Sequence, residues 1–187
     1  MFDDSDMKIV GAVGKAPAQA TETADFLAES GRQHFNGNFA KAKALGANIV
    51  SAFSYQAAPE ELDAMVRERG LQPEGVLLQQ MKFLSVFSAE YCLNRYLPSP
   101  MLASVAVGEM YDVLQQVSPA LYDALSHAAA FSFYYMSVKN AAAGGIGAQF
   151  AELCDMPDDP RVADLGDALH KLNCSVYKRA IRGFVFV

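Results

Sequence analysis

Residues 118–147 read SPALYDALSHAAAFSFYYMSVKNAAAGGIG, and this stretch carries the clearest fold signal in the chain. Ser118 and Pro119 form a typical helix start, because proline is favoured at the first helical position. The segment 128–138 is almost wholly apolar, and a glycine-rich run closes the stretch. A helix that is apolar on every side needs neighbours covering all of its faces. We therefore predict a central helix here, at the middle of a helical bundle or in an interface.

The rest of the chain contains start and stop signals that are typical of a helical protein. Pro59 is followed by two acidic residues, Gly70 is a natural C-terminal stop, and Pro160 follows an aspartate. We expect further helices over residues 21–34, 39–55, 59–69, 73–96, 101–117 and 147–155, and from 160 to beyond 176. The result is an all-α fold, a single-domain helical bundle of seven to eight helices over residues 1–187.

Two short β-branched segments differ from this pattern, at residues 7–13 and 183–187. Both are predicted to be extended segments at the termini. They either pair as strands or tuck in as tails.

The composition favours association with a second chain. Hydrophobic residues make up 52% of the sequence and charged residues 19%, which is more core material than a typical soluble domain contains. We therefore expect a homo-oligomer, most simply a homodimer. The net charge of −6 argues against nucleic acid as a partner, because phosphate binding needs a concentrated basic face.

The termini and cysteines indicate a cytoplasmic protein. Residues 1–6 are acidic where a secretory signal needs positive charge, and no apolar run approaches the roughly 20 residues that span a bilayer. We therefore expect no membrane contact. Cys92, Cys154 and Cys174 are widely spaced without a Cys-x-x-Cys pattern, so we interpret them as free thiols in a reducing compartment.

Two glycine motifs fail as nucleotide-binding signatures. The pair Gly14 and Lys15 lacks the earlier glycine of a phosphate loop, and Ala16 replaces its hydroxyl residue. The Gly-Ile-Gly of residues 145–147 lacks the third glycine of a dinucleotide fingerprint. We interpret residues 145–147 as a helix–helix joint, in which glycine permits close packing or a positive φ angle.

No metal or cofactor is expected. A four-helix di-iron site needs Glu-x-x-His on two helices, and this pattern is absent. The nearest patterns pair Asp123 with His127 and Asp167 with His170, each on one helix face.

The candidate site consists of polar side chains on otherwise apolar helix stripes. Three neighbouring helices are expected to direct these groups toward one interior, which is how small-molecule pockets are usually built. The predicted ligand-binding residues are Glu90, Asn94, Glu109, Asp123, His127 and Tyr134. In the alternative interpretation, each of these side chains is hydrogen-bonded to its own partner within the core, and no ligand is needed.

Three function hypotheses follow. The leading one is a non-catalytic module that binds a small apolar ligand or a protein partner, since no catalytic motif is present. The second is an enzyme in which Glu90, Glu109 and His127 transfer protons at a buried site. The third is a transcriptional regulator that reads DNA through a helix-turn-helix over residues 59–80.

Overall fold

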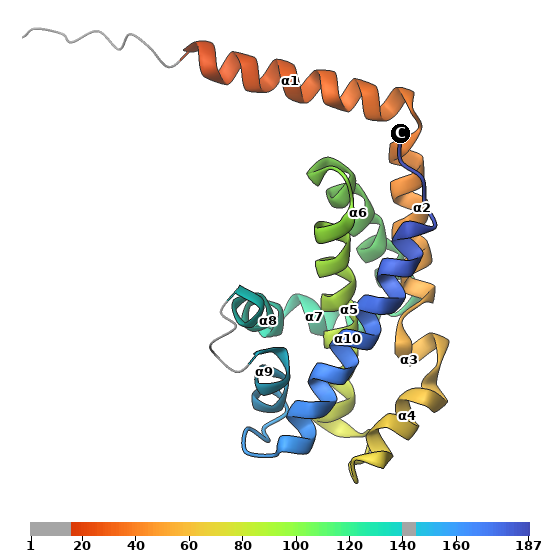
Figure 1. Cartoon of the computed structure of the whole chain (residues 1–187), viewed down its shortest axis with the longest axis vertical. Helices are drawn as coiled ribbons and strands as arrows, with labels where there is room; N and C mark the ends of the chain where they lie inside the picture. The colour runs from red at the N-terminus through yellow and green to blue at the C-terminus, as the bar shows by residue number, and fades with distance from the viewer. Residues whose placement is uncertain (1–15, 140–144) are drawn as a thin grey trace, which may run out of the picture. The chain divides into compact units, whose positions relative to one another are not determined.

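The computed structural model describes residues 16–139 and 145–187, and the fold within these ranges is all-α (Figure 1). The described residues form ten helices, slightly more than the seven to eight predicted. None of these helices combines the length and apolar character needed to cross a membrane. In chain order they are α1 Ala16–Phe35, α2 Asn38–Ser51, α3 Ser54–Ala57, α4 Pro59–Glu68, α5 Gly75–Tyr96, α6 Pro100–Val117, α7 Pro119–Ser126, α8 Ala130–Lys139, α9 Gly145–Leu153 and α10 Pro160–Arg182.

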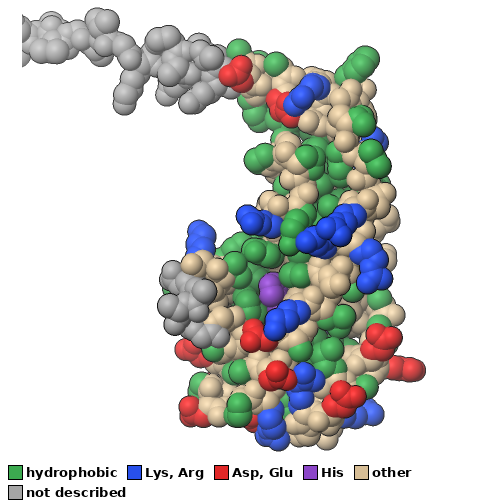
Figure 2. All heavy atoms as spheres, viewed as in Figure 1, with side chains coloured by type: hydrophobic (Ala, Val, Ile, Leu, Met, Phe, Trp, Pro, Cys, Tyr) green, Lys and Arg blue, Asp and Glu red, His purple; other side chains and the backbone are tan. Residues whose placement is uncertain are grey.

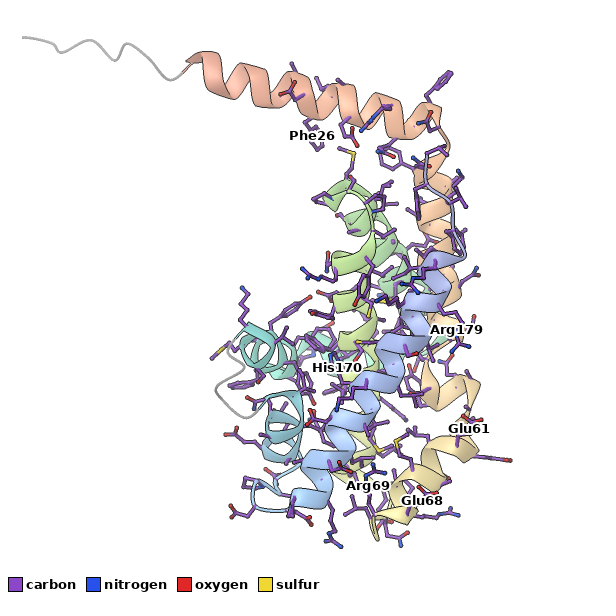
Figure 3. All side chains as sticks on the ribbon, viewed as in Figure 1. Phe26, Glu61, Glu68, Arg69, His170 and Arg179 are labelled. Carbon is purple, nitrogen blue, oxygen red and sulfur yellow. The ribbon has the colours of Figure 1, made fainter. Side chains whose placement is uncertain are left out.

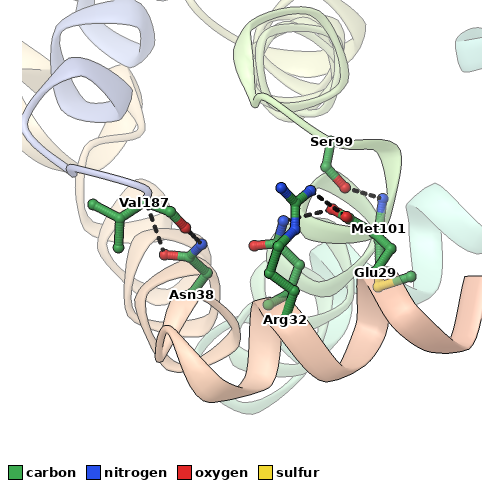
Figure 4. Close-up of polar contacts among 7 residues, drawn as sticks. Glu29, Arg32, Asn38, Ser99, Met101 and Val187 are labelled. Atoms are coloured by element: carbon green, nitrogen blue, oxygen red, sulfur yellow. Dashed lines mark hydrogen bonds and ion pairs between the residues drawn. The ribbon is translucent and has the colours of Figure 1, made fainter.

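Contacts divide the chain into two compact units, Met1–Gly37 and Asn38–Val187. In the first unit, the Glu29 carboxylate accepts hydrogen bonds from Arg32 and Gln33, one helical turn further along α1 (Figure 4). Phe26 and Leu27 on the same helix are exposed. The prediction of one domain over the whole chain stays a prediction.

The core of the second unit surrounds α5. Twelve of its residues are buried, and α3, α6, α8, α9 and α10 all pack against it. Its apolar residues face several directions, as a helix with neighbours on many sides requires. In the view of Figure 1, α8 and α9 lie on one side of α5 and α10, and α3 and α4 lie on the other.

The predicted central helix of residues 118–138 is wrong. This stretch forms two helices, α7 and α8, separated at residues 127–129. Ser126 and His127 bond back to the carbonyl oxygens of Tyr122 and Asp123, at 2.9 Å and 2.8 Å. Such side-chain bonds compete with helix continuation. In α8, Phe133 and Met136 are exposed, so the central position belongs to α5.

Two glycines of the predicted Gly-Ile-Gly joint have the expected roles, a positive φ angle at Gly145 and close packing at Gly147, where α9 meets α10. Gly145 has a φ of +75° at the start of α9. A Cβ on Gly147 would lie 2.2 Å from the Ala163 carbonyl oxygen of α10, and the Gly147 N–H donates to Asp167 Oδ1 at 2.8 Å. Asp167 is therefore a partner of the first turn of α9. Residues 141–144, which precede this joint, lie outside the described residues.

The C-terminal segment 183–187 contains no strand and tucks in as an extended tail. Buried Asn38 holds it at both polar atoms: Nδ2 donates to the Val187 backbone oxygen at 2.5 Å, and Oδ1 accepts from the Val187 N–H at 3.2 Å (Figure 4). Lys41 donates to the Val185 carbonyl oxygen at 2.8 Å. Its predicted counterpart, residues 7–13, lies outside the described residues.

Candidate functional site

A half-buried carboxylate joins three helices of the second unit. Glu90 of α5 accepts a hydrogen bond from the Tyr111 hydroxyl of α6 at 2.5 Å and from the Tyr135 hydroxyl of α8 at 2.8 Å. We call these three residues the Glu90 cluster. Burial, and then the negative charge of Glu90, raise the pKa of both tyrosines. Both phenols therefore remain protonated donors at neutral pH.

Two open depressions flank the Glu90 cluster. The first, of about 350 Å³, is named the Tyr122 depression. The second, of about 310 Å³, is named the Tyr91 depression. The Tyr122 depression is lined by Tyr111, Tyr122, Leu125, Ser126 and Phe131. The Tyr91 depression is lined by Tyr91, Asn94, Arg95, Tyr135, Val138 and Lys139. The Glu90 cluster thus contributes one tyrosine to each wall, and both volumes fall at the lower end of small-molecule sites.

Phe87 of α5 contacts residues of both depressions. Its fully buried ring lies 5.7 Å from the ring of Phe131, which lines the Tyr122 depression. It also lies 5.0 Å from the ring of Tyr135 and 6.2 Å from that of Tyr91, which line the Tyr91 depression. The pairs with Phe131 and Tyr135 are edge-to-face, and the pair with Tyr91 is stacked. The walls of the two depressions therefore pack against one buried aromatic ring.

The two depressions differ in charge. The Tyr122 depression is lined by aromatic, aliphatic and hydroxyl side chains. Exposed Arg95 and Lys139 lie at the Tyr91 depression, and neither has an ion-pair partner among the described residues. The Tyr91 depression can therefore accept a group with negative charge beside an apolar body.

Of the six predicted site residues, two belong to this region. Glu90 is its centre, and Asn94 lines the Tyr91 depression beside Tyr135. Tyr134 instead lies in the core, fully buried, with its hydroxyl donating to Gln80 Oε1 at 3.4 Å. Burial raises the pKa of Tyr134.

The other three predicted residues lie elsewhere. Glu109 of α6 faces Lys43 of α2 at 3.9 Å, with over a quarter of its side chain exposed. Asp123 and His127 are 79% and 78% exposed, so His127 is not the buried partner of Glu90 that the acid–base hypothesis requires. Within residues 16–139 and 145–187, no group of three or more His, Cys, Asp or Glu side chains is placed to hold a metal ion.

The sequence reasoning missed Tyr111, Tyr135 and Tyr91. Tyr134 was assigned to the site because a continuous helix would place it in line with His127. The break at residues 127–129 changes the phase, and α8 instead turns Tyr135 toward Glu90. The available signal for Tyr135 was the pair of adjacent tyrosines. Neighbouring residues of a helix point about 100° apart, so the two tyrosines had to face different neighbours.

The corner between α4 and α5 has a structural explanation. Arg69 ends α4, donates to the Met65 carbonyl oxygen at 2.9 Å and pairs with Asp164 of α10 at 2.8 Å. In Figure 3, Arg69 lies beside the first turns of α10. This arginine joins two helices of the protein, and α5 is largely buried beyond its first turn.

Comparison with protein-family models, with curated proteins and with solved structures found no significant match to this chain.

Proposed function

We propose that this protein is a non-catalytic module that binds a small ligand at the two depressions beside Glu90. The observation that carries the proposal is a pair of aromatic-lined depressions, each of which contains one tyrosine of the Glu90 cluster and one aromatic ring that packs against Phe87. Apolar walls with a few fixed polar groups are typical of ligand sites.

The chemistry of the walls defines the ligand. Tyrosine and phenylalanine rings favour a flat or apolar body, and Arg95 and Lys139 favour a negatively charged group at its end. We therefore infer an aromatic or aliphatic anion, such as an organic carboxylate. Hydrogen bonds from two tyrosines occupy both oxygens of Glu90, which favours a binding role over proton transfer.

The test uses anilinonaphthalene sulfonate, a fluorescent aromatic anion that matches this description. We expect saturable binding to the native protein, with affinity lowered at least about tenfold by Ser126→Phe or Asn94→Phe, because a ring added at either rim fills a depression. Gln115→Phe adds the same ring to an exposed position of α6 outside both depressions and should leave binding unchanged. Equal binding by all three variants would contradict the proposal.

Native mass spectrometry of freshly purified protein provides a second test. A discrete extra mass that is lost on denaturation would identify the natural ligand. An extra mass matching a polypeptide chain would favour the protein-partner hypothesis instead.

A further inference from the structure

A line of polar contacts runs along the seam between α5 and α10, separate from the Glu90 cluster. Its members are spaced three to four residues apart on each helix, so they lie on the two facing stripes. Two are hydrogen bonds of 2.8 Å, and the third joins a thiol to a carbonyl oxygen at 4.0 Å. The three contacts join Ser85 to Tyr177, Ser88 to His170, and Cys92 to Cys174.

The contact between Ser88 and His170 determines which ring nitrogen of the neutral histidine carries the proton. The Ser88 hydroxyl donates its only hydrogen to the Leu84 carbonyl oxygen at 2.7 Å. The 2.8 Å contact between Ser88 Oγ and His170 Nδ1 therefore has Nδ1–H as the donor. In the neutral ring, Nε2 then carries the lone pair.

Cys174 lies one helical turn after this histidine. Its Sγ is 3.6 Å from Nε2 and 3.8 Å from Nδ1 of His170. Because the two distances are nearly equal, the sulfur lies beside the ring rather than on the axis of either nitrogen. The sulfur and the imidazole are therefore close neighbours across one turn of α10. The neighbouring Cys92 thiol, and then His170, lower the pKa of Cys174.

The three cysteines differ in accessibility. Cys174 is partly exposed, whereas Cys92 and Cys154 are buried. Burial, and then the charge of Asp155, raise the pKa of Cys154 to about 12. In Figure 2 a histidine reaches the surface between hydrophobic side chains and a basic side chain, at the position labelled His170 in Figure 3. Small molecules in solvent can thus reach the neighbourhood of Cys174.

We propose that Cys174 is a peroxide-reactive thiol and that Cys92 resolves its oxidised form into a disulfide. The proposal rests on one partly exposed sulfur, 3.6 Å from the Nε2 atom of His170, and on the Cys92 thiol across the helix seam, whose sulfur lies 4.0 Å from the Cys174 carbonyl oxygen. It is independent of ligand binding beside Glu90. The expected oxidant is hydrogen peroxide or a small organic hydroperoxide.

Two steps transfer the electrons. The Cys174 thiolate attacks the terminal oxygen of the peroxide; the S–O bond forms, the O–O bond breaks, and the departing alkoxide or hydroxide takes a proton from water. The product is a sulfenic acid on Cys174. The Cys92 sulfur then attacks the Cys174 sulfur, forming the S–S bond, and the hydroxyl group leaves as water with the proton of Cys92. One peroxide is reduced, and the two thiols are oxidised together.

The first test measures alkylation of each cysteine by iodoacetamide, resolved by peptide mass spectrometry. In the native protein we expect Cys174 to react at least about tenfold faster than Cys154 at neutral pH, because only the thiolate is nucleophilic. In denaturant the cysteines should react at similar rates. His170→Asn should slow Cys174 about tenfold, while His127→Asn, at an exposed histidine, should have no effect.

The second test adds hydrogen peroxide in slight excess. Wild-type protein and Cys154→Ser should each form the disulfide between Cys92 and Cys174. Cys92→Ser should instead retain one added oxygen on Cys174, trapped by a sulfenic-acid reagent such as dimedone. The proposal fails if native Cys154 is alkylated as fast as Cys174, or if peroxide yields neither the disulfide nor the trapped adduct. If the His170 variant does not fold, the pH dependence of Cys174 alkylation in the wild-type protein is the deciding measurement. An alkylation rate that rises with the same midpoint pH as that of free cysteine would overturn the proposal.

Discussion

At Gly46 of α2, the absence of a side chain sets how closely two helices approach. A Cβ there would lie 2.2 Å from the Ala106 carbonyl oxygen and 3.1 Å from Glu109 Cβ, both on α6. Gly108, on α6 itself, is exposed and has open space where a Cβ would be. The two glycines therefore have different physical roles.

We expect the matched substitutions to change stability in opposite directions. Gly46→Ala should lower the free energy of unfolding by about 1–3 kcal/mol, because the added methyl group forces α2 and α6 apart. Gly108→Ala should raise it by about 0.5–1 kcal/mol, because alanine favours the helix. Urea denaturation measures both. A similar effect of the two variants would contradict the packing argument.

Asp159 determines how α10 begins. Its carboxylate accepts from the Arg161 N–H at 2.9 Å and from the Arg161 guanidinium at 2.7 Å. These hydrogen bonds with Arg161, side chain first, lower the pKa of Asp159 to about 2. The pKa of an aspartate in the unfolded chain is about 3.9.

The contribution of Asp159 to the free energy of unfolding should therefore depend on pH. Because the folded-state pKa is lowered, this contribution is fully present above about pH 4 and is lost as the pH falls toward 2. Asp159→Asn, which keeps a capping oxygen without the charge, should be less stable than wild type at pH 7, with the difference shrinking at low pH. Thermal unfolding across pH 2–7 is the measurement, with Asp158→Asn as the exposed control. A constant difference between the two proteins would refute this account.

At the scale of elements, the C-terminal tail is held on α2 by one buried amide. Asn38 is 1% exposed and satisfies both polar atoms of its side chain on Val187. Lys41 supports the same tail from an exposed position. The tail packs Phe184 and Phe186 against the core, so its attachment affects the stability of the α2 and α10 region.

Asn38→Ala should lower the free energy of unfolding by about 1–2 kcal/mol, since two hydrogen bonds are lost and the Val187 backbone groups lose a buried partner. Hydrogen exchange should also become faster at residues 185–187. Lys41→Ala, which removes one exposed hydrogen bond, should cost less than about 0.5 kcal/mol. If exchange at the tail is unchanged in Asn38→Ala, the tail is held by its aromatic side chains alone.

At the scale of the whole molecule, each unit exposes large apolar side chains. Phe26 is 59% exposed and Leu27 63% exposed in the first unit. Adjacent exposed apolar residues on one helix are typical of protein–protein contact sites. They are consistent with the homo-oligomer expected from the composition.

We expect native mass spectrometry of the full chain to give a homodimer that dissociates on dilution. The double variant Phe26→Ser with Leu27→Ser should shift the equilibrium toward monomer by at least about tenfold in dissociation constant, because these apolar side chains lose their burial. Val117→Ser, at an exposed valine of α6, is the control. A monomer at every concentration tested would rule out the expected oligomer.

The starts of α4, α6, α7 and α10 were predictable because their cause is local. Pro59, Pro100, Pro119 and Pro160 each occupy a first-turn position in the structure, where the fixed φ angle and missing N–H of proline are favourable whatever surrounds the helix. The all-α class followed from these starts and from the apolar spacing between them. It was also predictable that Glu90 has hydrogen-bond partners, because a carboxylate on an apolar stripe needs them.

Only the tertiary structure decided which helix is central and which tyrosines contact Glu90. The 128–138 run is more apolar than its surroundings, yet α5 is the buried helix, because burial depends on how many neighbours pack around an element. The helix break at residues 127–129 turned Tyr135 rather than Tyr134 toward Glu90. His170 and Cys174 acquired their partners from α5, which lies more than 70 residues earlier in the chain. Contacts of this range depend on helix phase and packing, which local sequence does not specify.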